Sequence, residues 1–171
     1  MANQILLRKV LLTNQESFLT AARKSRSLHQ NRGRVPHTAG ASRQCGKDMN
    51  MKTDIASLVK ARFSKALVGV VELKDIFRGN FRNAHVIYSV FEGYARHGYM
   101  TKAVEELIHI AFSRLRLHRL EASIQPNNRA SRSLAKAFEF RKEGLAKAFL
   151  KKGGEWRDHE RWAVTSTKLC Y

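Results

Sequence analysis

The chain has 171 residues, a length that accommodates one domain with a substantial core but not two domains of typical size. Apolar residues make up 43% of the sequence, which excludes a chain that is disordered throughout. Lysine and arginine outnumber aspartate and glutamate by 32 to 14, and the resulting formal charge of +18 predicts an anionic partner. The two cysteines, Cys45 and Cys170, form no CxxC pair, which argues against a disulfide framework or a zinc site.

The sequence also gives an expectation about membranes and secretion. Its longest strongly apolar stretch runs only from Ala66 to Val71, whereas a membrane-spanning helix needs about 20 such residues. Arg8 and Lys9 lie inside the apolar segment at the start rather than before it, unlike the charges of a secretory signal. We therefore expect a cytoplasmic protein that binds no membrane.

The first third of the chain predicts a strand, a helix and a loop. Residues 5–12 are rich in isoleucine, leucine and valine and predict a strand. Thr13, followed by Glu16 three residues later, forms a capping box that predicts a helix from Thr13 to about Leu28. Residues 29–50 combine glycine, proline and basic side chains without an apolar period, so we expect an irregular loop or insert there.

The middle of the chain predicts a hairpin, another strand and the most strongly patterned helix. Residues 54–63 and 66–73 predict a hairpin around Ser64-Lys65, and residues 84–91 predict a further strand. Between Tyr99 and Leu115, apolar side chains recur at helical spacing. This helix should therefore place one face against a core.

The last third predicts four shorter elements, namely a strand at 120–125, a helix at 131–138, and strands at 142–151 and 157–165. The last two strands flank Gly153-Gly154, as the two arms of a hairpin would. This order of elements predicts a single α/β (α+β) domain over residues 1–171 with a mixed sheet.

The junction between the strand at 84–91 and the helix that begins near Tyr99 is the most informative segment. Free backbone N–H groups and the positive end of the helix dipole meet there, and Arg96 adds a fixed positive charge. Such a junction favours a bound pyrophosphate. Gly98 by itself is also typical of a tight turn that leads into a helix.

The motifs that reveal a family resemblance are GYMTKAVEELIHIAFSRLRLHRLEASIQPNNRASRSLAKAFEFRKEG and FLKKGGEWRDHERWA. Together they resemble the acyl-CoA-binding region of the GNAT N-acetyltransferases, most closely the group that contains the ribosomal-protein-alanine acetyltransferases. The resemblance covers residues 66–164 and extends less firmly to ILLRKV near the start, whereas residues 31–52 do not match the family pattern. It implies a mostly antiparallel central sheet with flanking helices, in which two parallel strands splay apart and bind acetyl-CoA.

The resemblance also implies which residues bind this cosubstrate. Val90 and Phe91 would lie beside its pantetheine arm. Its phosphates would lie in a cradle formed by Arg96, His97, Gly98, Tyr99, Met100 and Thr101. Asn128 and Ser131 match the family's Asn-x-x-Ser pair, whose side chains face acetyl-CoA. From the residues alone, Asn128 can instead stabilise a turn and Ser131 can cap the helix that follows.

Four positions depart from the family pattern. Ala95 and Met100 replace the first and sixth residues of the phosphate-loop motif, which leaves only Gly98 of its usual residues. Ala135 stands where many relatives have a tyrosine that protonates the departing thiolate, but a thiol with a pKa of about 8.5 can leave without an acid. Glu139 replaces a glycine that often has a positive φ, so this turn should be strained.

Glu121 is the sequence-based candidate for the general base. Strand alternation places Arg119, Glu121, Ser123 and Gln125 on one face. A carboxylate there can accept a proton from a substrate ammonium, with a pKa raised by partial burial. An ion pair between Glu121 and Arg119 explains the residue equally well. His85, His97 and His118 have no recognisable catalytic or metal partner, and we expect no metal.

The resulting hypothesis is an N-acetyltransferase that moves an acetyl group from acetyl-CoA to an amine by direct attack on the thioester. The resemblance points to the N-terminal α-amine of a ribosomal or other protein, and the positive charge suits contact with ribosomal RNA. Two alternatives stay open: a small-molecule amine acetyltransferase, and a non-catalytic ribosome- or RNA-binding protein on the same scaffold.

Overall fold

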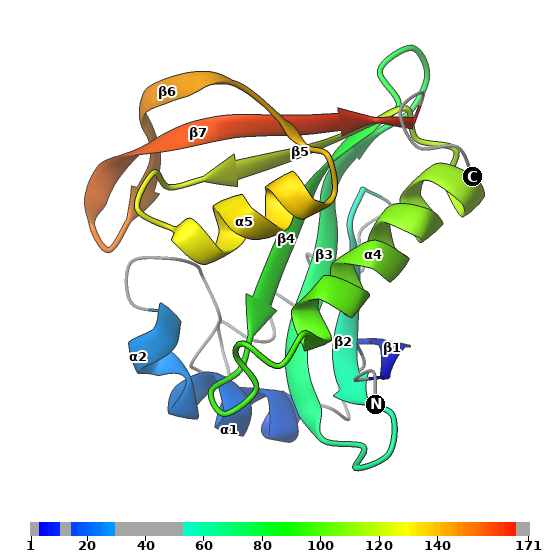
Figure 1. Ribbon diagram of the computed structural model, residues 1–171, viewed down its shortest axis with the longest axis vertical. Coiled ribbons are helices and arrows are strands. Elements are labelled where there is room, and N and C mark those ends of the chain that lie inside the picture. Colours follow the sequence, from blue (N-terminus) through cyan, green and yellow to red (C-terminus); the bar gives the residue numbers. More distant parts are fainter. Residues whose placement is uncertain (1–3, 11–14, 30–52, 167–171) are drawn as a thin grey trace.

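The computed structural model describes residues 4–10, 15–29 and 53–166. The capping residue Thr13 and residues 30–50 of the expected loop lie outside this part of the chain. The elements in chain order are β1 (Ile5–Lys9), α1 (Gln15–Lys24), α2 (Arg26–His29), β2 (Ile55–Ala61), β3 (Leu67–Phe77), β4 (Asn83–Val90), α4 (Tyr99–His109), a π-helical turn (Ile110–Arg114), β5 (Arg119–Ile124), α5 (Arg129–Ala137), β6 (Arg141–Lys152) and β7 (Glu155–Thr165) (Figure 1).

The strands form one seven-stranded sheet in the order β1-β2-β3-β4-β5-β7-β6. Every neighbouring pair is antiparallel except β4 and β5, which run parallel. The predicted mixed, mostly antiparallel sheet is therefore confirmed. The two predicted hairpins are β2–β3 and β6–β7, and the second turns at Gly153 and Gly154, which both have positive φ.

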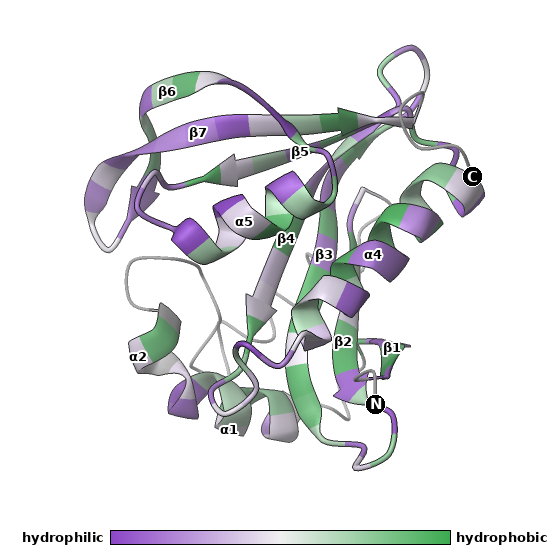
Figure 2. Ribbon diagram, viewed as in Figure 1, coloured by the Kyte–Doolittle hydropathy of each residue, from purple (hydrophilic) through white to green (hydrophobic). Residues whose placement is uncertain are grey.

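Helices cover both faces of the sheet, and strand alternation decides which side chains each helix meets. On one face, Val59 and Val71 belong to the large core that contains the buried side of α4. Their neighbours Leu58 and Val70 point the other way and pack with Phe18 of α1. In Figure 2, β3 is mainly hydrophobic, as expected for a strand covered on both faces.

The two N-terminal predictions need correction. The strand expected over residues 5–12 ends at Lys9, and residues 11–12 lie outside the described part. The helix expected to continue to Leu28 is interrupted at Ser25, which is fully buried. Ser25 Oγ donates to the carbonyl oxygen of Ala21 at 2.7 Å and accepts from the backbone N–H of Glu92 at 2.7 Å. A tertiary contact thus overrides helix propensity at this residue.

The helix predicted from Tyr99 to Leu115 is confirmed as α4, but its last turn is wider. Leu115 N donates to the carbonyl oxygen of Ile110 at 3.0 Å, five residues back, as in a π-helix. None of the described helices has the length and apolar character needed to cross a membrane.

Candidate functional site

β4 and β5 begin side by side and then separate, as Figure 1 shows. Their pairing consists of Asn83–Arg119, Ala84–Leu120 and His85–Glu121. Beyond these pairs β4 continues to Val90 and β5 to Ile124, each still bonded to its outer neighbour. Within the described chain, the inner backbone groups past the last pair thus lack a ladder partner and can bind an extended ligand. The splay expected from the family resemblance is therefore present.

The loop after β4 presents a helix N-terminus without a side-chain cap. Gly98 is the N-cap of α4 and has φ 74°, and Arg96 in the same loop has φ 64°. No acidic residue lies in the first turn of α4. The first-turn N–H groups and the positive end of the helix dipole are thus available to an anion, and the exposed Arg96 adds charge. This geometry fits a bound pyrophosphate.

The other residues of the expected phosphate cradle hold this loop in shape. His97 donates from Nδ1 to the carbonyl oxygen of Ala95 at 2.8 Å. The ring of Tyr99 packs edge-on against Tyr94, with centroids 6.0 Å apart. Met100 packs its methyl group over Gly69 of β3, and Thr101 is exposed on α4. Contact between these residues and acetyl-CoA stays a prediction.

Val90 ends β4 at the open end of the splay, and Phe91 follows it. Val90 is paired with Gly69, and Phe91 N donates to the carbonyl oxygen of Val68 at 2.8 Å. The Phe91 ring is buried against Phe18, with ring centroids 5.8 Å apart. Phe91 therefore anchors the strand end to α1, while the predicted position of both residues beside the pantetheine arm stays untested.

Asn128 and Ser131 form the start of α5. Asn128 is the N-cap, and its Oδ1 accepts from the backbone N–H of Ser131 at 3.2 Å. A helix cap, the alternative to a ligand-binding role, is thus present, but its capping side chain is Asn128 rather than Ser131. The cap uses only Oδ1, so the amide nitrogen of Asn128 can still serve a ligand.

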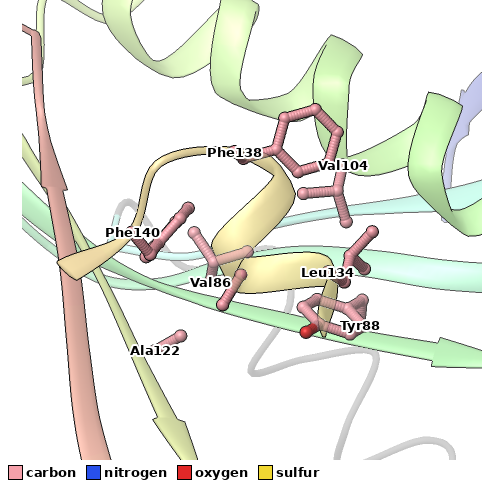
Figure 3. Close-up of a pocket in the computed structure, with 8 residues that line it drawn as sticks. Val86, Tyr88, Val104, Ala122, Leu134, Phe138 and Phe140 are labelled. Carbon is pink, nitrogen blue, oxygen red and sulfur yellow. The ribbon is translucent and has the colours of Figure 1, made fainter. Parts of the chain in front are cut away.

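An apolar cavity lies where β4 and β5 separate (Figure 3). It is lined by Val86, Tyr88, Val104, Ala122, Leu134, Ala135, Phe138 and Phe140. The Tyr88 hydroxyl donates to the carbonyl oxygen of Ser131 at 3.3 Å and so joins β4 to α5. Burial raises the pKa of Tyr88, and this hydrogen bond lowers it in part. Ala135 lines this cavity with a methyl group, so this position carries no hydroxyl beside the splay.

The turn after α5 has the strained backbone that the sequence predicted. Glu139 has φ 58°, in the left-handed region that favours glycine. Its backbone N–H donates to the carbonyl oxygen of Lys136 at 3.1 Å, so the turn is held by the end of the helix. Glu139 thus adopts the positive φ expected at this position although it is not a glycine.

We expect Glu139→Gly to raise the free energy of unfolding by about 0.5–1 kcal/mol, because relief of left-handed strain exceeds the added flexibility of glycine. Thermal unfolding measures this change. Glu139→Ala is the matched control: it removes the charge, keeps the strain and should leave stability unchanged. Equal stabilisation by both variants would show that the charge, not the backbone, is responsible.

Glu121 lies at the last β4–β5 pair and is held by arginines. Its carboxylate accepts from Arg119 Nε at 2.8 Å and from Arg161 Nη2. His85 Nε2 lies 3.5 Å from Glu121 Oε2. Burial alone would raise the pKa of Glu121, but the hydrogen bonds from the two arginines outweigh it, and the pKa is lowered. The expected raised pKa is therefore wrong, and the ion pair that the sequence left open is present; the role of Glu121 as base stays a prediction.

Sequence reasoning missed a second carboxyl group, that of Glu72 in β3. Glu72 is only 8% exposed. Burial raises the pKa of its carboxyl group to about 7, while the charge of Lys74 lowers this pKa and that of Asp54 raises it. The available signal was an acidic residue inside the apolar run LVGVVEL. Among the described residues, no group of three or more histidine, cysteine, aspartate or glutamate side chains is placed to hold a metal ion.

Solved structures share this fold. RimJ of Mycobacterium smegmatis, solved in complex with CoA-disulfide, superposes with a TM-score of 0.91 at 23% identity, covering 99% of this chain and 86% of that one. Ribosomal-protein-S5-alanine acetyltransferase of Vibrio fischeri gives a TM-score of 0.85 at 23% identity, covering 98% and 96%. At these identities the likeness establishes the fold.

Sequence comparison identifies the family. The chain is 32% identical over 102 residues to the [ribosomal protein uS5]-alanine N-acetyltransferase of Escherichia coli (strain K12), covering 60% of this chain and 53% of that protein. It is 37% identical over 98 residues to "Probable N-acetyltransferase YjcK" of Bacillus subtilis (strain 168), covering 57% and 54%. The chain thus spans about half the length of the curated relatives it matches. Residues 5–141 match the family described as "Acetyltransferase (GNAT) domain", and the chain belongs to this family.

Proposed function

We propose that this protein transfers an acetyl group from acetyl-CoA to an amine. The observation that supports this most is the splay of β4 from β5, which leads directly to the uncapped N-terminus of α4. The splay offers unpaired backbone groups to an extended arm, and the helix start offers N–H groups to a pyrophosphate. Acetyl-CoA has both parts, and the family match supports the same cosubstrate.

The acceptor we propose is the N-terminal α-amine of a ribosomal protein in the cytoplasm. Two observations support this choice: the match to a uS5-alanine N-acetyltransferase and the formal charge of +18, which suits contact with ribosomal RNA. In the reaction, the amine nitrogen attacks the thioester carbonyl carbon, the C–S bond breaks and coenzyme A leaves as thiolate. The chain's task is to align the two reactants and to accept the proton of the amine.

Mass spectrometry tests the activity and the acceptor together. The full chain is incubated with acetyl-CoA and either a peptide with the N-terminal sequence of ribosomal protein uS5 or spermidine. A mass gain of one acetyl group on the peptide α-amine supports the proposal. Acetylation of spermidine alone would assign the protein to small-molecule amines, and binding of acetyl-CoA without transfer to either would favour a non-catalytic role.

We expect Arg96→Glu to weaken acetyl-CoA binding by about 10- to 100-fold, because a charge-assisted contact to phosphate contributes about 1.5–3 kcal/mol. Calorimetry measures the dissociation constant, and an analogue without the phosphates should be affected less. Arg78→Glu is the control: it makes the same charge change at an exposed residue after β3, at the opposite end of β4 from the Arg96 loop. Equal affinity in wild type and Arg96→Glu would remove Arg96 from the site.

A further inference from the structure

Glu72 lies beside the splay of β4 and β5, and the proposed reaction described so far gives it no role. In the β3–β4 ladder Glu72 is the partner of Ile87, and directly opposite residues have Cβ atoms about 5 Å apart on the same face. Ile87 lies two residues past His85, the last β4 residue paired with β5. The Glu72 side chain therefore lies next to the part of β4 where the strands separate.

The face on which Glu72 lies is partly covered by α1 but is exposed to solvent at Ile87. Val86 and Tyr88 point to the opposite face and line the cavity under α5. Ile87, beside Glu72, is 43% exposed despite being a large apolar side chain. The exposed Ile87 thus offers an approach from solvent toward the splay on the side of Glu72, whereas α4 and α5 contribute to the lining of the cavity on the other side.

Within the part of the chain that the structure describes, no ion pair is made by the Glu72 carboxyl. Lys74 follows it on β3 and is 3.5 Å from Asp54, which precedes β2. On β4 the titratable group of this face is His85, held between Asp75 and Glu121. On α1, the charged residues Glu16, Arg23 and Lys24 are exposed. Among the described residues, Lys74 and Asp54 are the charges that act on Glu72, and their effects oppose each other, so burial dominates its protonation.

We propose that Glu72 is the catalytic base that accepts the proton of the acceptor amine. The inference rests on the proposed transfer to an amine and deepens it. The amine nitrogen forms a bond to the acetyl carbon as the C–S bond breaks, the proton from nitrogen goes to the Glu72 carboxylate, and coenzyme A leaves with the electron pair of the C–S bond.

The acid–base chemistry favours an α-amine as the acceptor. A general base works best when its pKa lies near the operating pH, and its driving force for proton transfer falls as the pKa of the substrate ammonium rises above its own. Burial places the pKa of Glu72 at about 7, close to the 7.7–8.0 typical of an α-amino group and far from the value of about 10.4 for a lysine-type amine. Glu121, with its lowered pKa, is a weaker base.

The test compares pH–rate profiles of wild type, Glu72→Gln and Glu72→Asp with saturating acetyl-CoA, using whichever of the uS5 peptide and spermidine the wild type acetylates faster. Glu72→Gln should lower kcat by about 100- to 10,000-fold and lose the ascending limb near pH 7. Its KM for acetyl-CoA should stay within about twofold, because the cosubstrate is bound elsewhere. Glu72→Asp should keep the limb at lower kcat. Glu106→Gln, on the exposed side of α4, is the matched control and should behave as wild type.

Two results overturn the assignment. One is a kcat of Glu72→Gln within threefold of wild type with the limb intact; if Glu121→Gln loses the limb instead, Glu121 is the base. The other does not depend on any acceptor: carbon NMR of the acetyl-CoA-bound protein should show one carboxyl titrating near pH 7 that is absent from Glu72→Gln. If no such carboxyl exists, Glu72 is not the base, whichever amine the enzyme acetylates.

Discussion

Gly69→Ala is expected to lower the free energy of unfolding by about 2–3 kcal/mol, the upper part of the range for overpacking a core. A Cβ built on Gly69 lies closer than 3.0 Å to the carbonyl oxygen of Ser89 and 3.2 Å from Cα of Val90. Both are backbone atoms of β4, so the strand itself must move. The same Cβ lies 2.7 Å from Met100 Cε, at the start of α4. Chemical denaturation measures the change.

The position of Gly69 predicts a functional effect as well. Val90 and Met100 belong to the expected acetyl-CoA site, so displacing them should also raise the dissociation constant for the cosubstrate. Gly144→Ala in β6 is the matched control, because its added Cβ meets no atom within 4 Å, and we expect a change within about 0.5 kcal/mol. Equal stability of the two variants would mean that β4 can shift away from Gly69 of β3 without a cost in stability.

Much of the fold followed from local patterns in the sequence. Val104, Leu107 and Ile108 repeat at helical spacing, and all three are buried on α4. Gly153 and Gly154 mark the β6–β7 turn because they have the positive φ that a tight turn requires. Glu139 was expected to have a positive φ from the glycine that it replaces, and it does. Each of these features depends on residues that are close in the sequence.

The errors came from contacts between distant residues. Ser25 ends α1 because its hydroxyl meets the backbone of Glu92, 67 residues later. Glu121 was expected to have a raised pKa, but Arg161 reaches it from β7, 40 residues away. The alternation of side chains along a strand shows which face each one occupies. It does not show which charged side chain of a neighbouring strand will contact it. The candidate base was therefore the least predictable part of the site.

The location of Glu72 also depends on a contact between residues that are distant in the sequence. Its neighbours in the sequence indicate a strand covered on both faces, so a carboxyl there should be buried. The ladder partner Ile87, which brings Glu72 to the splay, lies 15 residues away beyond a loop. A bulge between Lys74 and Phe77 shifts the register, and this shift is not visible in the sequence. The proposed role of Glu72 therefore follows from the strand pairing in the sheet and could not be inferred from the sequence alone.

The same carboxyl group should make the stability of the protein depend on pH. The pKa of Glu72 is about 7 in the folded protein, raised from 4.5 by burial. Because the folded state binds the proton more tightly than the unfolded state, the free energy of unfolding falls as the pH rises from 4.5 to 7. The difference of about 2.5 pKa units corresponds to roughly 3 kcal/mol lost above this range.

Glu72→Gln should remove this loss, because an amide resembles the protonated acid and does not ionise. We expect wild type and variant to have equal free energies of unfolding near pH 4, and the variant to be more stable by about 3 kcal/mol at pH 8. Urea denaturation at a series of pH values measures the difference. Glu106→Gln, at an exposed site on α4, should follow the wild-type curve throughout.

Parallel curves for wild type and Glu72→Gln would mean that the buried carboxyl finds a compensating partner when it ionises, and its pKa would then lie near the ordinary value. Curves that diverge as predicted would place a destabilising carboxylate beside the splay, at the partner of Ile87. Removing it should make the protein more stable while slowing acetyl transfer. This opposite effect on stability and turnover separates a catalytic carboxyl from a structural one, because losing a structural ion pair lowers stability.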